Sequence, residues 1–382
     1  MVQVDLITGF LGAGKTTFLR RYVRYLVAQG HNVCILENDF GAVNVDAMLV
    51  QDLLGPNCDL ETISGGCDCD THQRRMRTKL IAMAMRGFDR VVVEPSGIFD
   101  VDEFFDVLRD DPLDRWYHIG NVIAIVDAML PETLSPQAEY VLASETANAG
   151  RVLVSRTQLA GQQQTAAAVA HLTRALEGCK CSRRFAPEEI ITKDWARLTD
   201  ADLAAIAACG CRQASCEKLH FDEHEAFSSL CFLEQHLTLQ QLQAAADHLF
   251  ADAACGHVLR VKGFAPDPQG TTGWLELNAT AAGRTLEPIP QGQDVLIVIG
   301  EGLDKAAIEA RLKAEFSTQK QQNGEKQKEK EKEVMNKTRQ APSARRIIGM
   351  VMGVIIIALG PFIQFFDGHF AQKVLKYKQE KE

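Results

Sequence analysis

The sequence predicts an α/β protein: a parallel sheet with helices on both faces, followed by a small α+β C-terminal domain and a C-terminal transmembrane helix. Three observations lead to this fold class. Apolar strands alternate with helices through the first half of the 382 residues, as a parallel sheet requires. A glycine-rich turn joins the first strand to the first helix, and an uncharged, apolar run long enough to span a bilayer occupies residues 347–366.

The glycine-rich turn, residues 9–17 (GFLGAGKTT), fits G-x-x-x-x-G-K-[ST], the phosphate-binding loop of nucleotide triphosphatases. It lies between an apolar strand at 2–7 and an amphipathic helix at 17–26. Glycines let the backbone bend so that successive N–H groups point at phosphate oxygens, and the helix N-terminus adds its dipole. Lys15 would act in catalysis by reaching the β- and γ-phosphates, and the Thr16 hydroxyl would hold Mg²⁺. We therefore predict a P-loop NTPase sheet whose nucleotide is bound by Gly9, Gly12, Ala13, Gly14, Lys15, Thr16 and Thr17.

Acidic residues follow two further strands of the expected sheet. Asp39 comes after the strand at 32–36, and Glu94 ends the strand that begins at Asp89. In an open α/β sheet, ligands bind beyond the carboxyl ends of the strands, so both acids would face the nucleotide. We expect Asp39 and Glu94 to hold Mg²⁺ or its waters, or to orient the attacking water, and we expect the Gly97 N–H to meet the γ-phosphate. For Asp39, a solvated turn is the alternative.

Residues 64–72 (SGGCDCDTH) place two cysteines one residue apart, behind two glycines and among acidic side chains. As thiolates, Cys67 and Cys69 suit Zn²⁺ or another borderline transition metal such as Co²⁺. Asp70 or His72 could supply a third ligand. Buried free cysteines are the common alternative, but this loop is too polar for a core. We therefore predict a transition-metal site formed by Cys67, Cys69, Asp70 and His72.

Composition narrows the classes of partner. The net charge of −9 argues against a general nucleic-acid binder, so no nucleic acid is expected. The 11 cysteines point to metal or redox chemistry rather than to a disulfide framework. A second metal cluster at Cys209, Cys211, Cys216 and His220 is conceivable, but scattered thiols in a connector are the stronger interpretation.

The order of these motifs resembles the CobW-type GTPases, relatives of the urease- and hydrogenase-maturation GTPases that act as metal chaperones or metal insertases. The resemblance implies GTP as the nucleotide, Mg²⁺ as its cofactor and a client metalloprotein as partner. It continues to about residue 314, through 220–229, 257–264 and 295–300. The motifs that carry it in the first half are, in order, 9–17, 38–41 (NDFG), 66–70 (GCDCD), 94–97 (EPSG) and 126–127 (VD).

Two departures from that family's pattern bear on chemistry. Its loop Cys-x-Cys-Cys has Asp70 at the last position here, and a carboxylate is a harder ligand than a thiolate. Its guanine-reading Asn-Lys-x-Asp matches residues 155–158, so Ser155, Arg156 and Gln158 are the expected base contacts. The Gln158 amide has one acceptor oxygen and also presents donors, whereas a carboxylate would accept both hydrogen bonds of the guanine edge. The preference between GTP and ATP therefore stays open.

The second half of the chain is predicted to form a connector, a small domain and a tail. The expected boundaries are a P-loop GTPase domain at 1–195, a connector at 196–218 and a CobW-type α+β domain at 219–316. Within the small domain we expect strands at 257–264, 273–279, 284–289 and 294–299, and a final helix at 304–316.

A charged linker at 317–346 leads to the apolar run 347–366 and a short tail at 367–382. Twenty helical residues span roughly 30 Å, the thickness of a bilayer core, so we expect one transmembrane helix. Arg345 and Arg346 place the preceding domains on the cytoplasmic face of the membrane. Gly349 and Gly353 form a G-x-x-x-G face that could pair two chains as a homodimer. The alternative is a buried core helix or an interfacial one.

The sequence as a whole predicts a GTP hydrolase that couples Mg²⁺-dependent hydrolysis to the binding of a transition metal and its delivery to a client protein at the membrane. Two other classes fit part of the pattern. One is a non-hydrolysing, nucleotide-dependent membrane adaptor, and the other is an ATP-using enzyme built on the same phosphate loop.

Overall fold

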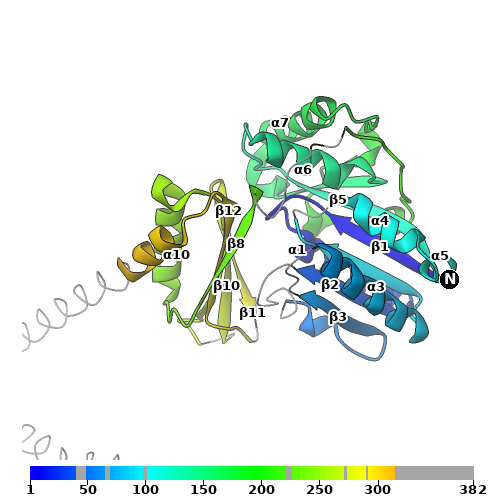
Figure 1. Cartoon of the computed structure of the whole chain (residues 1–382), viewed down its shortest axis with the longest axis horizontal. Coiled ribbons are helices and arrows are strands. Elements are labelled where there is room, and N and C mark those ends of the chain that lie inside the picture. Colours follow the sequence, from blue (N-terminus) through cyan, green and yellow to red (C-terminus); the bar gives the residue numbers. More distant parts are fainter. Residues whose placement is uncertain are drawn as a thin grey trace, which may run out of the picture. The chain divides into compact units, whose positions relative to one another are not determined.

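The computed structural model describes residues 1–39, 49–64, 69–97, 101–217, 219, 226–270, 273–289 and 291–314, and it describes Asn38, Asp39, Ser64, Cys69, Asp70, His72 and Glu103 by their backbone alone. The predicted linker, transmembrane helix and tail at 317–382 lie outside these residues. So does Cys67. Residues 1–313 form one compact unit that contains two sheets (Figure 1).

The larger sheet is parallel and has the strand order β3-β2-β4-β1-β5-β6-β7. Its strands are β1 (Val2–Thr8), β2 (Val33–Asp39), β3 (Cys58–Ser64), β4 (Arg90–Pro95), β5 (Tyr117–Asp127), β6 (Arg151–Ser155) and β7 (Ile190–Ile191). The helices of this region are α1 (Lys15–Ala28), α3 (Cys69–Met85), α4 (Val101–Arg109), α5 (Leu113–Trp116), α6 (Pro136–Ala147), α7 (Thr157–Gly178) and α8 (Asp200–Ile206).

Both faces of the parallel sheet are buried, because successive strand residues enter different apolar layers. On β1, Leu6 packs in the layer under α3 to α7, and Ile7 packs in the layer under α1 and α8. Val91 and Val92 divide in the same way on β4. Strands buried on both sides appear as continuous apolar runs, which is the pattern that the sequence shows. The predicted parallel sheet with helices on both faces is confirmed.

The smaller sheet is antiparallel, with strand order β11-β10-β9-β12-β8. Its strands are β8 (Ser228–Leu233), β9 (His257–Pro266), β10 (Trp274–Thr280), β11 (Gly283–Ile289) and β12 (Val295–Glu301). Helix α10 (Leu239–Ala251) covers one face, and a helix at 305–314 follows β12 (Figure 1). Four of these strands lie within about two residues of the bounds that alternation predicts.

The expectation of a transmembrane helix at 347–366, and of a membrane location, is corrected. Within the described ranges no helix is both long and apolar enough to cross a bilayer, and residues 347–366 lie outside those ranges. Helix α7 has the length, with 22 residues, but it carries a Gln162–Gln164 run, His171 and Arg174, whose transfer into hydrocarbon is costly. The fold class supported here is the α/β parallel sheet followed by the smaller antiparallel sheet.

One disulfide joins the segment after α7 to the connector. Cys181 bonds to Cys216, although the composition pointed to metal or redox chemistry rather than to a disulfide framework. Main-chain hydrogen bonds hold the two segments alongside each other. Ser182 N donates to Ser215 O at 2.8 Å, and Glu217 N donates to Cys179 O at 2.9 Å. A sequence gap of 35 residues between the two cysteines gave no local signal of this pairing.

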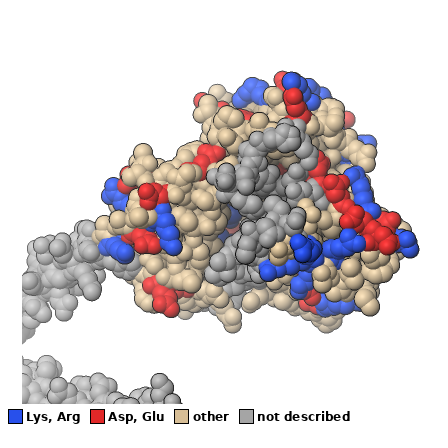
Figure 2. All heavy atoms as spheres, viewed as in Figure 1, with Lys and Arg blue, Asp and Glu red and all other residues tan. Residues whose placement is uncertain are grey.

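Charges of both signs lie side by side on the described surface (Figure 2). Many form exposed ion pairs, such as Arg86 with Asp59 and Glu61. Exposed pairs contribute only about 0–1 kcal/mol each, because water screens them and long side chains lose entropy in forming them. The electrostatic interactions that matter for stability are therefore the buried ones.

The buried carboxylate of Asp5, in the middle of β1, joins three strands and α1. Its Oδ2 accepts hydrogen bonds from the Tyr22 hydroxyl at 2.8 Å and from Arg90 Nη1 at 2.7 Å. Its Oδ1 accepts from Asn121 N and Nδ2, both at 2.9 Å. The side chain of Asp5 is fully buried, and burial beside this carboxylate raises the pKa of Tyr22 far above its usual range. The charge is tolerated inside the sheet because these donors satisfy both of its oxygens.

We expect Asp5→Ala to lower the free energy of unfolding by about 3–5 kcal/mol, because it removes the buried carboxylate that pairs with Arg90 and accepts from Asn121 N. Urea unfolding measures the change. Asp247→Ala, which removes an exposed carboxylate paired with Arg284, is the matched control and should cost less than about 1 kcal/mol. Equal losses in the two variants would show that the Asp5 network does not stabilise the sheet.

Candidate functional site

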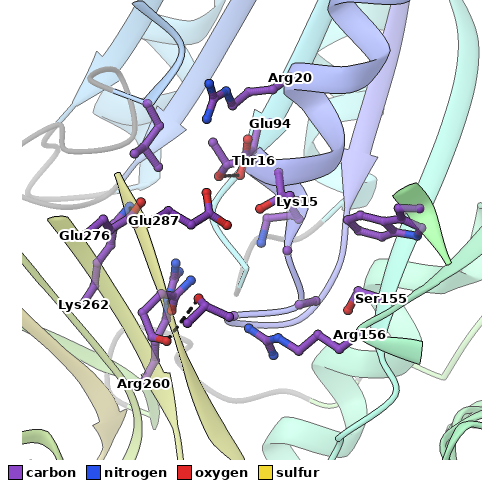
Figure 3. A pocket seen from close by; sticks show the side chains of 18 of the residues that line it. Lys15, Thr16, Arg20, Glu94, Ser155, Arg156, Arg260, Lys262, Glu276 and Glu287 are labelled. Atoms are coloured by element: carbon purple, nitrogen blue, oxygen red, sulfur yellow. Dashed lines mark hydrogen bonds and ion pairs between the residues drawn. The ribbon is translucent and has the colours of Figure 1, made fainter. Parts of the chain in front are cut away.

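A cavity of about 250 Å³ opens at the carboxyl ends of β1, β4 and β6 (Figure 3). Because the strands are parallel, the loops that follow them meet at the same edge of the sheet. Ten of the residues predicted to bind nucleotide or Mg²⁺ line this one cavity: Gly12, Ala13, Gly14, Lys15, Thr16, Thr17, Glu94, Ser155, Arg156 and Gln158.

The phosphate loop, residues 9–17, is held at its start by close backbone packing. A Cβ on Gly9 would lie 2.3 Å from the Ile125 carbonyl oxygen of β5, and Gly9 has a φ of +139°, so no other residue fits there. The Gly9 N–H donates to Oε2 of the fully buried Glu145 at 2.9 Å. Sequence reasoning missed Glu145, because it lies in the last turn of α6, far along the chain.

Lys15 and Thr16 begin α1 directly behind the loop. Lys15 Nζ donates to the Gly9 carbonyl at 2.8 Å, so its side chain folds back over the loop that it would serve. The Thr16 hydroxyl donates to Glu94 Oε1 at 2.7 Å. A hydroxyl and a carboxylate at this distance, both lining the cavity, form an all-oxygen donor set of the kind that Mg²⁺ prefers.

Gly97 and Asp39 flank this pair. A Cβ on Gly97 would lie 2.8 Å from Leu11 N and 2.8 Å from Lys15 Nζ, so the turn after β4 touches the phosphate loop. Asp39 ends β2, which pairs with β4 in a register that sets Glu37 beside Glu94. The backbone of Asp39 therefore reaches the same edge of the sheet, while its side chain lies outside the described residues.

The predicted transition-metal site is only partly covered by the structure. Cys67 lies outside the described residues, and Cys69 and Asp70 are seen as the first backbone positions of α3. The side chain of His72, one turn into α3, is not described either. The loop leaves β3 at Ser64, which pairs with Asp39, so it starts at the edge of the sheet where the acids lie.

Elsewhere in the described chain, no group of three or more His, Cys, Asp or Glu is arranged to hold a metal ion. Of the second cluster that we considered, Cys216 is bonded to Cys181, and His220 lies outside the described residues. Burial raises the pKa of Cys209 to about 12 and also raises the pKa of Cys211, which keeps both thiols protonated at neutral pH. A protonated thiol is a poor metal ligand.

The expected base contacts lie at the carboxyl end of β6. Ser155 is buried, and its hydroxyl has no hydrogen-bond partner among the described residues. Arg156 is in the left-handed region, with a φ of 54° at the N-cap of α7, and forms an ion pair with Asp127 at the end of β5. Burial raises the pKa of Asp127, and the charge of Arg156 opposes that shift. Gln158 also lines the cavity.

Sequence reasoning missed the 3₁₀ helix η3 (Trp195–Arg197), which closes this side of the cavity. The Trp195 ring lies 3.6 Å from the position of a Cβ on Gly14, and its buried Nε1 has no hydrogen-bond partner in the described part of the chain. Arg21 of α1 donates to the carbonyls of Trp195 and Leu198, which fixes η3 against α1. The preceding strand β7 has only two residues, too few for alternation to reveal it.

The opposite wall comes from the smaller sheet. Its residues in the cavity are Arg260, Lys262, Glu276, Asn278, Thr285 and Glu287 (Figure 3). They lie more than 100 residues beyond the phosphate loop in the chain, and their only sequence signal is the alternation of polar with apolar positions on three strands.

The first half of the chain is similar to a known protein family. Residues 3–182 match the family model described as CobW/HypB/UreG, nucleotide-binding domain. Residues 3–182 are a CobW-type nucleotide-binding domain. The resemblance that the motifs predicted is thereby confirmed.

Several relatives of this CobW-type domain are named as zinc chaperones. The zinc chaperone YjiA of Escherichia coli is 31% identical over 173 residues, which are 43% of this chain and 52% of the relative. The zinc chaperone CobW of Pseudomonas aeruginosa is 30% identical over 137 residues, 33% and 36% of the two chains. The chain thus spans about half, or less, of the length of these relatives. The solved structure of the Zn(II)-bound YjiA GTPase covers 82% of this chain and 98% of that one, with 22% identity and a TM-score of 0.32.

We expect the CobW-type domain to discriminate weakly between GTP and ATP, because Gln158 stands where a carboxylate would accept two hydrogen bonds from guanine. Gln158→Asp should sharpen the preference for GTP by about 10-fold or more, the value of one hydrogen bond to a charged group. Competition titrations with GDP and ADP against a fluorescent nucleotide measure it. Gln163→Asp, at an exposed position of α7 that does not line the cavity, is the control. A strong guanine preference that is present already and does not change in Gln158→Asp would contradict the expectation.

Proposed function

We propose that this chain is a GTP hydrolase of the CobW type, which couples Mg²⁺-dependent hydrolysis to the binding of a transition metal and its delivery to a client metalloprotein. The observation that carries the proposal is the meeting of Lys15, Thr16 and Glu94 in one cavity behind a phosphate loop. The match of residues 3–182 to a nucleotide-binding family supports it.

The residues around the phosphate loop have different roles in this proposal. The N–H groups of the loop and the N-terminus of α1 bind the phosphates. Lys15 exchanges the Gly9 carbonyl for the β- and γ-phosphate oxygens. Thr16 and Glu94 would hold Mg²⁺, which would neutralise part of the phosphate charge. Asp39 and Glu94 orient the attacking water, and Gly97 N–H binds the γ-phosphate.

The metal half of the proposal is supported by chemistry and by the names of relatives. Cys67 and Cys69 offer two thiolates, with Asp70 and His72 beside them, which is a donor set for Zn²⁺ or Co²⁺. Several relatives, YjiA and CobW among them, are named zinc chaperones. The loop that holds the cysteines leaves β3 at Ser64, which pairs with Asp39, so it starts at the edge of the sheet where the nucleotide would bind.

We expect Lys15→Ala to weaken GTP binding by about 10- to 100-fold, the value of losing one or more hydrogen bonds to a charged group, and to abolish turnover. Nucleotide titration and phosphate release measure the two effects, and circular dichroism checks the fold. Arg24→Ala removes an exposed cation from the same helix and should change neither effect. GTP affinity and turnover that persist in a folded Lys15→Ala protein would rule out the proposed function.

We expect the double variant Cys67→Ser/Cys69→Ser to lose Zn²⁺ and Co²⁺ affinity by more than the roughly 10- to 100-fold that loss of an outer-shell contact costs. Wild-type affinity should fall as the pH drops, because both thiols must lose their protons to bind. Titration with Co²⁺, followed by thiolate-to-metal absorption, measures both. Cys231→Ser, in the smaller sheet, is the control. If the double variant binds as tightly as the wild type, the metal site lies elsewhere.

A further inference from the structure

The smaller sheet has two chemically different faces. Residues alternate along a strand, so every second side chain points to the same side. On one side Val261, Gly263 and Leu277 pack against α10, and Leu242 lies 2.6 Å from the position of a Cβ on Gly263. The other side, here called the polar face, carries six residues that line the phosphate cavity: Arg260 and Lys262 of β9, Glu276 and Asn278 of β10, and Thr285 and Glu287 of β11.

The polar face meets the phosphate loop at close range. A Cβ on Gly12 would lie 3.2 Å from Thr280 Cγ2 and 3.8 Å from Arg260 Cδ. Gly12 belongs to the phosphate loop, so the Arg260 side chain passes directly over the turn whose N–H groups would bind phosphate. Figure 3 shows Arg260, Lys262, Glu276 and Glu287 on one side of the cavity and Lys15 and Thr16 on the other.

Two cations on the polar face have different partners. Lys262 Nζ lies 3.1 Å from Glu276 Oε1, and both side chains are at least 94% buried, so they form a buried ion pair. The Arg260 guanidinium donates from Nε to the neutral Asn278 Oδ1 at 3.0 Å and makes no ion pair within the described part of the chain. Arg260 thus brings a positive charge to the cavity that no described carboxylate neutralises.

The acids on the polar face make that charge important. Glu276 and Glu287 are register partners on β10 and β11, and burial together with the charge of Glu276 raises the pKa of Glu287. Lys262 already pairs with Glu276, and an ionised Glu287 beside that pair repels a phosphate group. Arg260 is therefore the side chain through which the polar face can attract an anion. It would do so on the side of the cavity opposite Lys15.

We propose that Arg260 contacts the terminal phosphate of a nucleoside triphosphate bound to the phosphate loop, so that the smaller sheet distinguishes the triphosphate from the diphosphate. Asn278 acts as a positioning residue, because its amide oxygen holds the guanidinium through Nε and leaves the two Nη groups for phosphate oxygens. The inference rests on the proposed function only in requiring that the loop binds nucleotide. The contact consists of hydrogen bonds and charge attraction, and no covalent bond forms or breaks.

The same face links this contact to the segment between β2 and β3. Beyond its polar residues it becomes apolar, and Phe264, Ile289, Val295 and Ile297 pack around Leu49. Leu49 also lines the cavity. The smaller sheet would therefore be held at two points, by apolar packing around Leu49 and by the contact of Arg260 with a terminal phosphate. Loss of that phosphate would release the second anchor and keep the first.

The experiment compares affinities of the full chain for GTPγS and for GDP, each measured with Mg²⁺ by competition against a fluorescent nucleotide. Arg260→Ala should weaken GTPγS binding by about 10- to 100-fold, the value of a hydrogen-bonded charge contact, and leave GDP affinity unchanged. Arg260→Lys should retain part of the preference, because it keeps the charge and loses the planar fork. Asn278→Ala should lower the preference by less than Arg260→Ala does.

Arg284→Ala is the matched control. Arg284 lies on β11 of the same sheet but pairs with Asp247 of α10, on the opposite side, and it does not line the cavity. It should change neither affinity. Equal loss of GTPγS and GDP binding in Arg260→Ala, or no loss of either, would overturn the inference while the wild type still binds nucleotide. Failure of the wild type to bind either nucleotide would instead overturn the proposed function.

Discussion

The close approach of the phosphate loop to β5 is the constraint on which the rest of the site depends. At Gly9 the chain passes so near the Ile125 carbonyl that a Cβ would lie 2.3 Å from it, and Glu145 fixes the Gly9 N–H from behind. The loop that follows can then turn into α1 with Lys15 folded back onto the Gly9 carbonyl. Thr16, one residue later, meets Glu94 from β4. Gly9 thus fixes where the phosphate loop leaves β1, and Lys15 and Thr16 follow it into the cavity.

Two sheets line the cavity, and each contributes a different part of it. The parallel sheet supplies the loops at its carboxyl edge, since its strands all end on the same side. The antiparallel sheet uses α10 to bury one face and turns its polar face towards the phosphate loop. Buried charges are stable in these positions because each is hydrogen-bonded or paired, as the Lys262–Glu276 pair and the Asp5 network show. A sheet with one apolar and one charged face can therefore pack on a helix and take part in a nucleotide site.

Much of the fold could be predicted because its signals are local. The phosphate loop has a short motif with a mechanism, and strands buried on both faces appear as apolar runs. The position of Glu94 followed from one rule about parallel strands. The predicted transmembrane helix was wrong, because an apolar run of the right length is only a candidate, and no described helix meets both requirements. Trp195, Glu145 and the Cys181–Cys216 disulfide were missed because nothing in their neighbouring sequence marks them.

The sequence by itself determined the phosphate-loop motif, the alternation of strands and helices that makes a parallel sheet, and the donor types near the nucleotide. These depend on residue identity and spacing over fewer than about 20 residues, where backbone geometry is nearly fixed. Only the tertiary structure decided that the polar face of β9 to β11 lines the same cavity as Lys15. That contact joins Gly12 to Arg260, far apart in the chain, and it forms because α10 buries the apolar face and leaves the charged one to meet the loop. Packing of whole elements decides such a meeting, and no local pattern encodes it.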